Sequence, residues 1–413
     1  MNKNAHWDIL LSNEVNKKGF IQMLLSGQAK GKLSFLNSFK GMLFSDIAIA
    51  NYIEQEYRYE TSESIKNTNR KLNTFSSGER KKAYLEYCLA QKPDFLIIDN
   101  PLDHLDQASR KDLIVFLENL SESVILVQLI NRSVDQLEFI ENKAFINDNF
   151  YALAEINEDK KSDFILNKIA IPSAINKLEE SETELIKFEK VSVSYEDRKI
   201  INSISWTINK GEFWQLVGPN GSGKSTLLSM ITGDNQKAYG QNIYLFGKKK
   251  GSGETIWDIK KKIGIYTTSM TDLFQKRETV ENMILSGYFD SIGLYIEPTS
   301  FQRQTVAKWL KLINLSTLKN KYFNQISIGQ QRIVLIIRAI IKQPQLVILD
   351  EPFEGLDDKN VELLGQLINI LKQETAMALI FVSHRIEPIL KPNLVYELIP
   401  SNNGSEGKTI QIT

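Results

Sequence analysis

The chain has 413 residues, of which 42% are hydrophobic and 24% are charged, as in ordinary globular domains. Lysine plus arginine and aspartate plus glutamate number 50 each, and this balance argues against a dedicated nucleic-acid binder, which needs a basic excess. The single cysteine, Cys88, excludes an intrachain disulfide and a cysteine metal cage, and we expect it in the core. At ~100–200 residues per domain the length predicts two domains. With no signal peptide and no membrane-spanning apolar run, we expect a cytoplasmic protein.

The first third of the chain contains an apolar run, residues 95–98, that ends in Asp99 and continues into Asn100. Ser76 lies 23 residues before Asp99, in the sequence Ser76-Ser77-Gly78-Glu79, and Asp106 lies 7 residues after it. An unbroken apolar run is typical of a parallel strand that is buried on both faces. Helical patterns alternate with such runs along the chain. The sequence therefore predicts an α/β fold with a central, mostly parallel sheet.

A charged and polar segment follows, with Glu158-Asp159-Lys160-Lys161, Pro172 and Glu179-Glu180. Such a composition is typical of a linker. We therefore expect one domain at residues 1–157, a linker at 158–183 and a second domain at 184–413.

Residues 218–225 have the sequence Gly-Pro-Asn-Gly-Ser-Gly-Lys-Ser and satisfy the phosphate-loop pattern G-x-x-x-x-G-K-[ST]. They follow an apolar strand and open a helix at Thr226, which is the context that the motif requires. The glycines let backbone N–H groups surround phosphate oxygens, and the helix N-terminus adds partial positive charge. We expect Lys224 to bind the β- and γ-phosphates and Ser225 to ligate Mg²⁺. The predicted nucleotide contacts of this loop are Gly218, Asn220, Gly221, Ser222, Gly223, Lys224, Ser225 and Thr226.

Four more residues of the second half are candidates for the same site. Tyr195, 23 residues before Gly218, is expected to stack on adenine, although a core or surface tyrosine would fit the same pattern. Asp350 ends an apolar run and is expected to ligate Mg²⁺, with a structural salt bridge as the alternative. Glu351 is then placed to orient or deprotonate the attacking water. His384 follows the apolar strand 378–382, where it is expected to contact the γ-phosphate.

The spacings of the first half recur in the second. Ser327 lies 23 residues before Asp350, and Asp357 lies 7 residues after it, with matched residue types around each position. Two equal spacings predict a tandem duplication.

Taken together, a phosphate loop, a serine–glycine signature before an Asp-Glu strand, a Leu-Asp loop and a strand-end histidine resemble the ATP-binding cassette (ABC) ATPases. Residues 284–295 and 327–332 are similar to tandem cassettes of the ModF type of molybdate-transport ATP-binding proteins, also called photorepair-associated PhrA. Leu285-Ser286-Gly287 is a decoy for the signature, because it lies 64 residues before Asp350.

The resemblance implies two P-loop NTPase domains, ATP hydrolysis with Mg²⁺, and head-to-tail pairing in which the signature of one cassette closes over the nucleotide of the other. On that pattern Ser76, Gly78 and Asp106 complete the nucleotide site of the second half. Its catalytic residues would be Glu351, His384 and Lys224. Cassettes usually carry a glutamine near residue 268, and here Thr268 is expected to replace it as a metal contact.

The first half departs further from the pattern. Trp7 lies 10 residues before Lys17, as Trp214 lies 10 before Lys224, so the two segments align without gaps. The alignment sets Leu11, Glu14 and Asn16 against the three loop glycines, and Asn100 takes the place of Glu351. A phosphate loop cannot easily form without those glycines. We therefore expect the first half to be truncated and degenerate, with no nucleotide site of its own.

The process that ATP hydrolysis drives stays open at this stage. One hypothesis is an energy-coupling subunit that docks on separately encoded membrane permease subunits, at the inner face of the plasma membrane. The alternatives are a soluble ABC ATPase that acts on nucleic acid or ribosomes, a non-transport regulatory ATPase, and a non-catalytic scaffold. Translation-factor cassettes carry a long basic linker and two intact phosphate loops, which this chain lacks. The lysine clusters 248–250 and 260–262 are expected to form a solvated β-hairpin face, with nucleic acid or lipid headgroups as the other contact considered.

Overall fold

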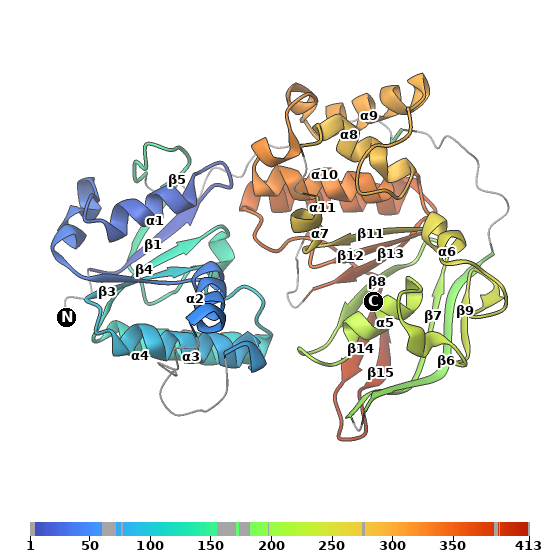
Figure 1. Cartoon of the computed structure of the whole chain (residues 1–413), viewed down its shortest axis with the longest axis horizontal. Helices are drawn as coiled ribbons and strands as arrows, with labels where there is room; N and C mark the ends of the chain where they lie inside the picture. Colours follow the sequence, from blue (N-terminus) through green and yellow to red (C-terminus); the bar gives the residue numbers. More distant parts are fainter. Residues whose placement is uncertain are drawn as a thin grey trace. The chain divides into compact units, whose positions relative to one another are not determined.

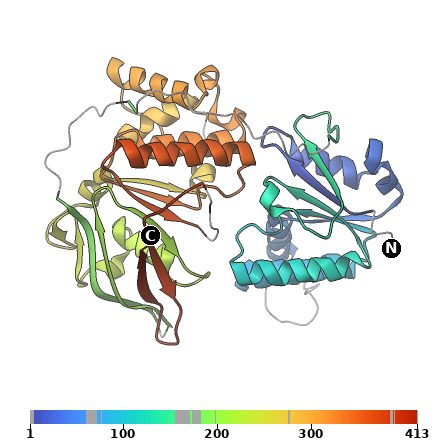
Figure 2. The same cartoon turned by 180° about the vertical axis from the view of Figure 1, so that it is seen from behind.

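The computed structural model describes residues 5–59, 72–75, 77–154, 171–172, 182–196, 198–274, 277–383, 387 and 389–411. The chain divides into two compact units: Met1–Asp163 with Gly355–Lys359, and Phe164–Glu354 with Asn360–Thr413. Ser76, His384 and most of the expected linker lie outside the described residues. Figures 1 and 2 show that each unit has a central sheet with helices on both of its sides.

The first unit is built on a five-stranded parallel sheet with the order β2-β3-β4-β1-β5. Helix α1 packs on one face through Phe20 and Leu24. Helices α3 and α4 pack on the other face through Leu85, Cys88 and Leu117. The elements are β1 (Trp7–Leu11), α1 (Lys17–Leu25), β2 (Gly41–Phe44), α2 (Asp46–Tyr59), α3 (Ser77–Ala90), β3 (Phe95–Asp99), α4 (Gln107–Ser121), β4 (Ile125–Ile130) and β5 (Asn142–Ile146).

Cys88 belongs to this core, as the sequence predicted. Its side chain is fully buried, and burial raises the pKa of the thiol to about 11. The thiol is therefore protonated and unreactive at neutral pH.

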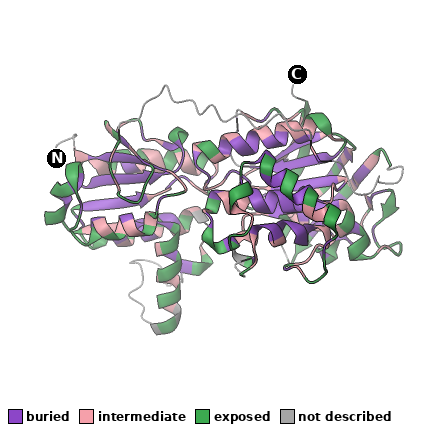
Figure 3. Ribbon diagram, turned by 90° about the horizontal axis from the view of Figure 1, so that it is seen from above, coloured by how far each residue is buried: buried purple, intermediate pink, exposed green. Residues whose placement is uncertain are grey.

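The second unit has a six-stranded sheet with the order β11-β12-β13-β8-β14-β15, parallel except for its last pair. The unit also has a four-stranded antiparallel sheet with the order β10-β9-β6-β7. Helix α5 packs against this sheet, since its residues Leu227 and Ile231 share a core with Phe188 and Trp206. Figure 3 shows inner strands such as β8, β12 and β13 mostly buried and the outer helix faces exposed. Strands β10 and β15 are exposed.

The elements of the second unit are β6 (Glu184–Tyr195), β7 (Arg198–Asn209), β8 (Phe213–Val217), α5 (Lys224–Ile231), β9 (Ile243–Leu245), β10 (Lys248–Lys249), α6 (Ile256–Lys262), β11 (Ile263–Thr267), α7 (Met270–Leu273), α8 (Val280–Leu285), α9 (Ser300–Leu312), α10 (Ile328–Ile340), β12 (Leu346–Asp350), α11 (Asp358–Glu374), β13 (Ala378–Val382), β14 (Leu394–Ile399) and β15 (Glu406–Gln411).

The two parallel sheets have the same strand order. Strands β2, β3, β4, β1 and β5 correspond to β11, β12, β13, β8 and β14 in turn. The residues after β3 and β12 also correspond: Asn100 has φ 43° and Glu351 has φ 49°. Each donates its backbone N–H to the neighbouring strand, at 2.8 Å to Leu129 and 3.0 Å to Val382. The duplication predicted from residue spacing is thus a duplication of the fold.

A buried carboxyl distinguishes the first sheet. Asp8 of β1 is fully buried and lies in register with Gln128 of β4. Burial raises the pKa of Asp8 to about 7, although the backbone N–H of Leu137 donates to Oδ2 at 3.1 Å and so opposes the shift. The corresponding pair of the second sheet is Gln215 and Phe381, without a carboxyl.

The lysine clusters do not form one solvated hairpin face. Lys248 and Lys249 are exposed on β10, but Lys250 is buried, lies 3.6 Å from Glu254 and covers the ring of Tyr239. The second cluster, residues 260–262, forms the last turn of α6, where cations stabilise the negative end of the helix dipole. The expectation failed because a two-residue strand and a capped helix lie where we expected one hairpin.

Within the part of the chain that the structure describes, every helix is too short or too polar to cross a membrane.

Candidate nucleotide-binding site

The phosphate loop connects β8 to α5 in a conformation that its glycines make possible. Gly223 has φ 98°, and a Cβ built on it would lie 2.6 Å from Cγ2 of Ile201. Gly218 has φ 154°, and its Cβ would lie 2.6 Å from Oγ of Ser222. Both the backbone angle and the available space therefore require glycine. The cradle that these missing side chains leave is the feature that a bound phosphate chain needs.

Helix α5 begins at Lys224 without a side-chain cap, because its N-cap residue is Gly223. The first N–H groups of a helix have no partner within the helix, and here no N-cap side chain accepts from them. Such a helix end is a natural anion site. The Lys224 side chain is largely buried, and Nζ donates to the carbonyls of Gly218 at 2.7 Å and Pro219 at 3.0 Å.

Asp350 ends β12 close to this lysine. Burial raises the pKa of Asp350, while the charge of Lys224 favours the ionised carboxylate and lowers it. Ser225, Thr267 and Asp350 all line one cavity of about 440 Å³. Hydroxyl, carboxylate and phosphate oxygens are ligands that Mg²⁺ prefers. The donor set of this cavity therefore fits a magnesium ion bound together with a nucleotide.

Thr267 is the threonine that β11 brings to this cavity. It ends the strand in register with Asp350 on β12, and its Oγ1 lies 3.0 Å from Oγ of Ser269. Thr268, which the sequence suggested, is the next residue and is not part of the cavity lining. Parallel strands in register place their last residues side by side. The sequence does not show at which threonine β11 ends, so it did not single out Thr267.

Of the two other catalytic candidates, the structure describes Glu351 but not His384. Glu351 directly follows Asp350 in a left-handed backbone conformation, and its N–H bond to Val382 holds it at the carboxyl edge of the sheet. His384 lies outside the described residues, two positions after the end of β13. Both follow adjacent strands, β12 and β13.

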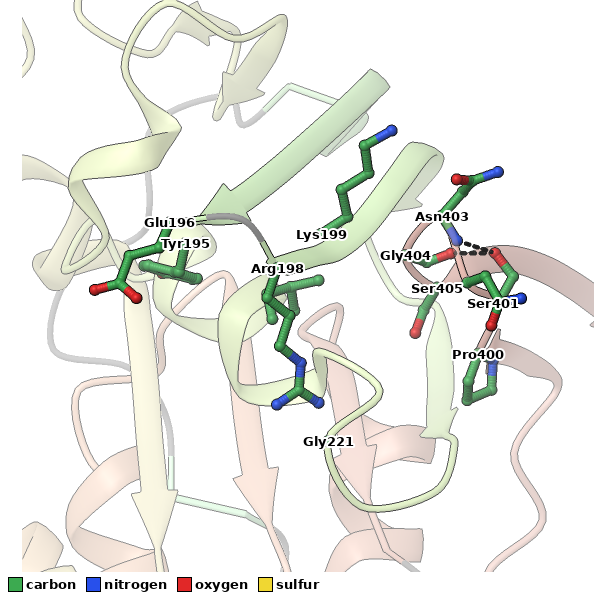
Figure 4. Close-up of a pocket in the computed structure, with 12 residues that line it drawn as sticks. Tyr195, Glu196, Arg198, Lys199, Gly221, Pro400, Ser401, Asn403, Gly404 and Ser405 are labelled. Atoms are coloured by element: carbon green, nitrogen blue, oxygen red, sulfur yellow. Dashed lines mark hydrogen bonds between the residues drawn. The ribbon is translucent and has the colours of Figure 1, made fainter.

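A second cavity, of about 670 Å³, lies on the other side of the phosphate loop (Figure 4). Tyr195, Arg198 and Gly221 line it, together with the turn Ser401–Ser405 between β14 and β15. Tyr195 is 43% exposed, and its hydroxyl accepts a hydrogen bond from Nδ2 of Asn235 at 2.9 Å. This bond holds the ring in a cavity that also reaches the phosphate loop, as an adenine-stacking residue requires.

The described residues of the two serine–glycine signatures lie at helix N-termini. Ser327 is the N-cap of α10, where Oγ accepts from the N–H of Gln330 and the Gln330 side chain accepts from the N–H of Ser327. In the first unit Gly78 lies in the first turn of α3, and Asp106 caps α4 by accepting from the N–H of Ser109 at 2.9 Å.

The decoy signature is a buried structural element. Ser286 is fully buried, donates to the carbonyl of Met283 at 2.7 Å and accepts from Nε of Arg338 at 3.0 Å. A nucleotide phosphate cannot reach a serine in that position.

In the first unit the lysine that corresponds to Lys224 is engaged by side chains. Lys17 Nζ forms an ion pair with Oδ1 of Asp99 at 2.8 Å and donates to Oδ1 of Asn131 at 2.8 Å. Asn100 donates to the same Asn131 oxygen at 2.8 Å. Asp99 and Asn100, which correspond to Asp350 and Glu351 of the second unit, thus belong to one polar network with Lys17 and Asn131.

The N-terminus of α1 is also occupied by the protein. Asn16 caps it, with its side chain accepting from the N–H of Gly19 at 3.0 Å. The N–H of Asn16 donates to Oδ1 of Asn149 at 2.6 Å, and the hydroxyl of Tyr151 donates to the Asn16 carbonyl at 3.2 Å. A Cβ on Gly19 would lie 2.5 Å from that hydroxyl, so the loop is closely covered. The described residues of the first unit thus have the strand order of the second, but the N-terminus of their first helix is capped and covered by side chains.

Comparison with known proteins identifies the family. A family model described as ABC transporter matches residues 201–354. ModF of Escherichia coli, an ABC transporter ATP-binding protein, is 40% identical over an alignment of 334 positions, which covers 77% of this chain and 68% of ModF. This chain belongs to the ABC transporter ATP-binding proteins. An uncharacterised ABC transporter ATP-binding protein of Schizosaccharomyces pombe is 32% identical over an alignment of 326 positions, which covers 76% of this chain and 65% of that protein.

Membership of the ABC family confirms the fold and the chemistry that the sequence predicted. The chain is an ATP-binding ATPase of the P-loop NTPase fold. One chain of a solved structure of ribosome-bound archaeal Pelota and ABCE1 is similar to this chain, with a TM-score of 0.65 and 14% sequence identity. The alignment covers 99% of this chain and 75% of the other. Likeness at that identity concerns the fold alone.

Proposed function

We propose that this ABC protein hydrolyses MgATP at a single site, built on the phosphate loop of the second unit. The observation that carries the proposal is the contrast between the two helix N-termini. Helix α5 begins behind a glycine cradle without a side-chain cap, whereas α1 is capped by Asn16 and its lysine is ion-paired with Asp99. The same fold thus has one anion site open to a ligand and one satisfied internally.

Each residue of the site has a defined part in the proposed reaction. Lys224 and the α5 N-terminus bind the phosphate chain, and Tyr195 stacks on adenine. Ser225 and Asp350 hold the magnesium ion, which supplies charge neutralisation when it is bound; Thr268 or its neighbour Thr267 adds a hydroxyl. Glu351 orients the attacking water. This follows the general logic of phosphoryl transfer, in which positioning and electrostatics dominate.

We further propose that the signature of the first half completes this site through Ser76, Gly78 and Asp106, and that His384 contacts the γ-phosphate. The equal spacings of the two halves support the proposal, because the signature and the Leu-Asp loop of the first half are retained while its phosphate loop is not. ATP would then promote association of the two cassettes, and hydrolysis would release them.

The cellular role that we propose is that of an energy-coupling subunit for a transport system, with separately encoded permease subunits in a membrane. The relatives are ABC transporter ATP-binding proteins by name, which supports this role. Fractionation of cells that express the tagged chain tests it. Recovery with membrane permease subunits is the expected result, and recovery with ribosomes instead would contradict the transport role.

The single-site proposal is tested by a matched pair of substitutions, because Lys17 and Lys224 each begin the helix after the first strand of a parallel sheet. Lys224→Ala should abolish ATP binding and turnover. Lys17→Ala should change the ATP dissociation constant and the turnover rate by less than about threefold each, which corresponds to ~0.7 kcal/mol. Equal losses in an equilibrium ATP-binding assay would contradict a single site.

A further inference from the structure

A basic residue lies next to the phosphate loop on the side of the predicted adenine contact. Arg198 begins β7 and pairs with Tyr195, the last residue of β6. Directly paired residues of an antiparallel ladder have side chains on the same face of the sheet, whereas the next residue along a strand points to the opposite face. Tyr195 and Arg198 therefore share a face, and Lys199 does not.

The guanidinium of Arg198 extends toward the loop. Its Nη2 lies 3.8 Å from the position that a Cβ on Gly221 would take. Figure 4 shows the Arg198 side chain pointing toward the loop that carries Gly221, whereas the side chain of Lys199 points the other way. Both residues border the cavity of about 670 Å³ described above.

Within the described part of the chain, no carboxylate forms an ion pair with Arg198. Among the residues that the structure describes, none forms a hydrogen bond or an ion pair with the Arg198 side chain, which is exposed. A guanidinium offers a planar set of donors that matches two oxygens of a phosphate at once. An available guanidinium beside an anion-binding loop is therefore suited to a polyphosphate.

We infer that Arg198 is a second cation for the phosphate chain of the nucleotide, acting beside Lys224 from the β6–β7 hairpin. The inference rests on the proposed single site and names one more residue that holds its substrate. Arg198 would bind the polyphosphate from outside the loop, while Lys224 binds it from the start of α5. The contribution is to affinity, and it does not depend on the base.

The test compares Arg198→Ala with Lys199→Ala, adjacent residues that are both exposed and both cationic. The dissociation constant of MgATP is measured by calorimetry, and that of inorganic tripolyphosphate by competition with labelled ATP. Because a hydrogen bond to a charged group is worth a factor of ~10 or more, and exposure places Arg198 at the low end, we expect Arg198→Ala to weaken both ligands about tenfold. Lys199→Ala should change neither by more than about twofold. Arg198→Lys, which keeps the positive charge but loses the planar pair of donors, should restore only part of the affinity. The effect should shrink in high salt.

Two results would overturn the assignment of Arg198. Equal dissociation constants for Arg198→Ala and Lys199→Ala would show that its position has no special role. Weaker ATP binding with unchanged tripolyphosphate binding would place the guanidinium against the base or the ribose instead. Failure of the single-site proposal is distinguishable, because Lys224→Ala would then bind ATP as tightly as the wild type.

Discussion

Removing the Lys17 ammonium should destabilise the first unit without weakening ATP binding. The side chains of Lys17 and Asp99 are 24% and 13% exposed, so their ion pair is mostly buried. Loss of one partner costs ~3–5 kcal/mol in a fully buried pair and ~0–1 kcal/mol in an exposed one. For this intermediate case we expect Lys17→Ala to lower the free energy of unfolding by about 1–3 kcal/mol. At ~2–4 °C per kcal/mol for a domain of this size, the melting temperature of the first unit falls by roughly 2–12 °C.

Thermal unfolding of the full chain, followed by circular dichroism, measures this shift, and equilibrium dialysis of ATP accompanies it. Lys18→Ala is the matched control, because Lys18 is the next residue of α1 and is exposed. It should leave the melting temperature within about 1 °C, as surface substitutions usually do. Asp99→Leu should reproduce the loss, and the double variant should lose less than the sum of the two, since the pair interacts directly. An unchanged melting temperature for Lys17→Ala, or loss of ATP binding, would refute the reasoning.

Three further predictions concern turnover and pH. Glu351→Gln should keep the ATP dissociation constant and lower kcat by about 10²–10⁴-fold, and turnover equal to the wild type would exclude Glu351 as the catalytic carboxylate. Ser76→Arg should lower ATPase activity about 10–100-fold, and Ser327→Arg should lower it much less. A larger loss of activity for Ser327→Arg would point instead to a site between two copies of the second half. Because Asp8 has a pKa of about 7 when folded and 3.8 ordinarily, unfolding free energy should fall by up to about 4 kcal/mol between pH 4 and pH 7. Asp8→Asn should flatten that pH dependence, and an identical pH profile would contradict burial as its cause.

The fold could be predicted because its signals are local and repeated. Glycine spacing fixed the phosphate loop, and the spacing of Ser76 to Asp99 and of Ser327 to Asp350 indicated the duplication that the shared strand order shows. The absence of loop glycines around Lys17 likewise predicted a helix N-terminus unlike that of the second half, and in the structure Asn16 caps it.

The partners of individual side chains could not be predicted. The sequence does not show that Asn131 and Asp99 bind the Lys17 ammonium, because the three residues are far apart in the sequence. They meet only because the fold brings the ends of neighbouring strands together. Arg198 was overlooked because its relation to Tyr195 depends on the hairpin register. The lysines of α6 were expected in a β-hairpin, but a capping box at Thr255 starts a helix there.

The number of ATP molecules bound per chain tests the single-site account most directly. Glu351→Gln protein is suited to the measurement, because it should hold ATP without hydrolysing it. Equilibrium dialysis with labelled ATP and Mg²⁺, at protein concentrations well above the dissociation constant, should saturate at one ATP per chain. Lys17→Ala added to this variant should leave that value at one. Saturation at two ATP per chain would show that the first half binds nucleotide after all and would contradict the account.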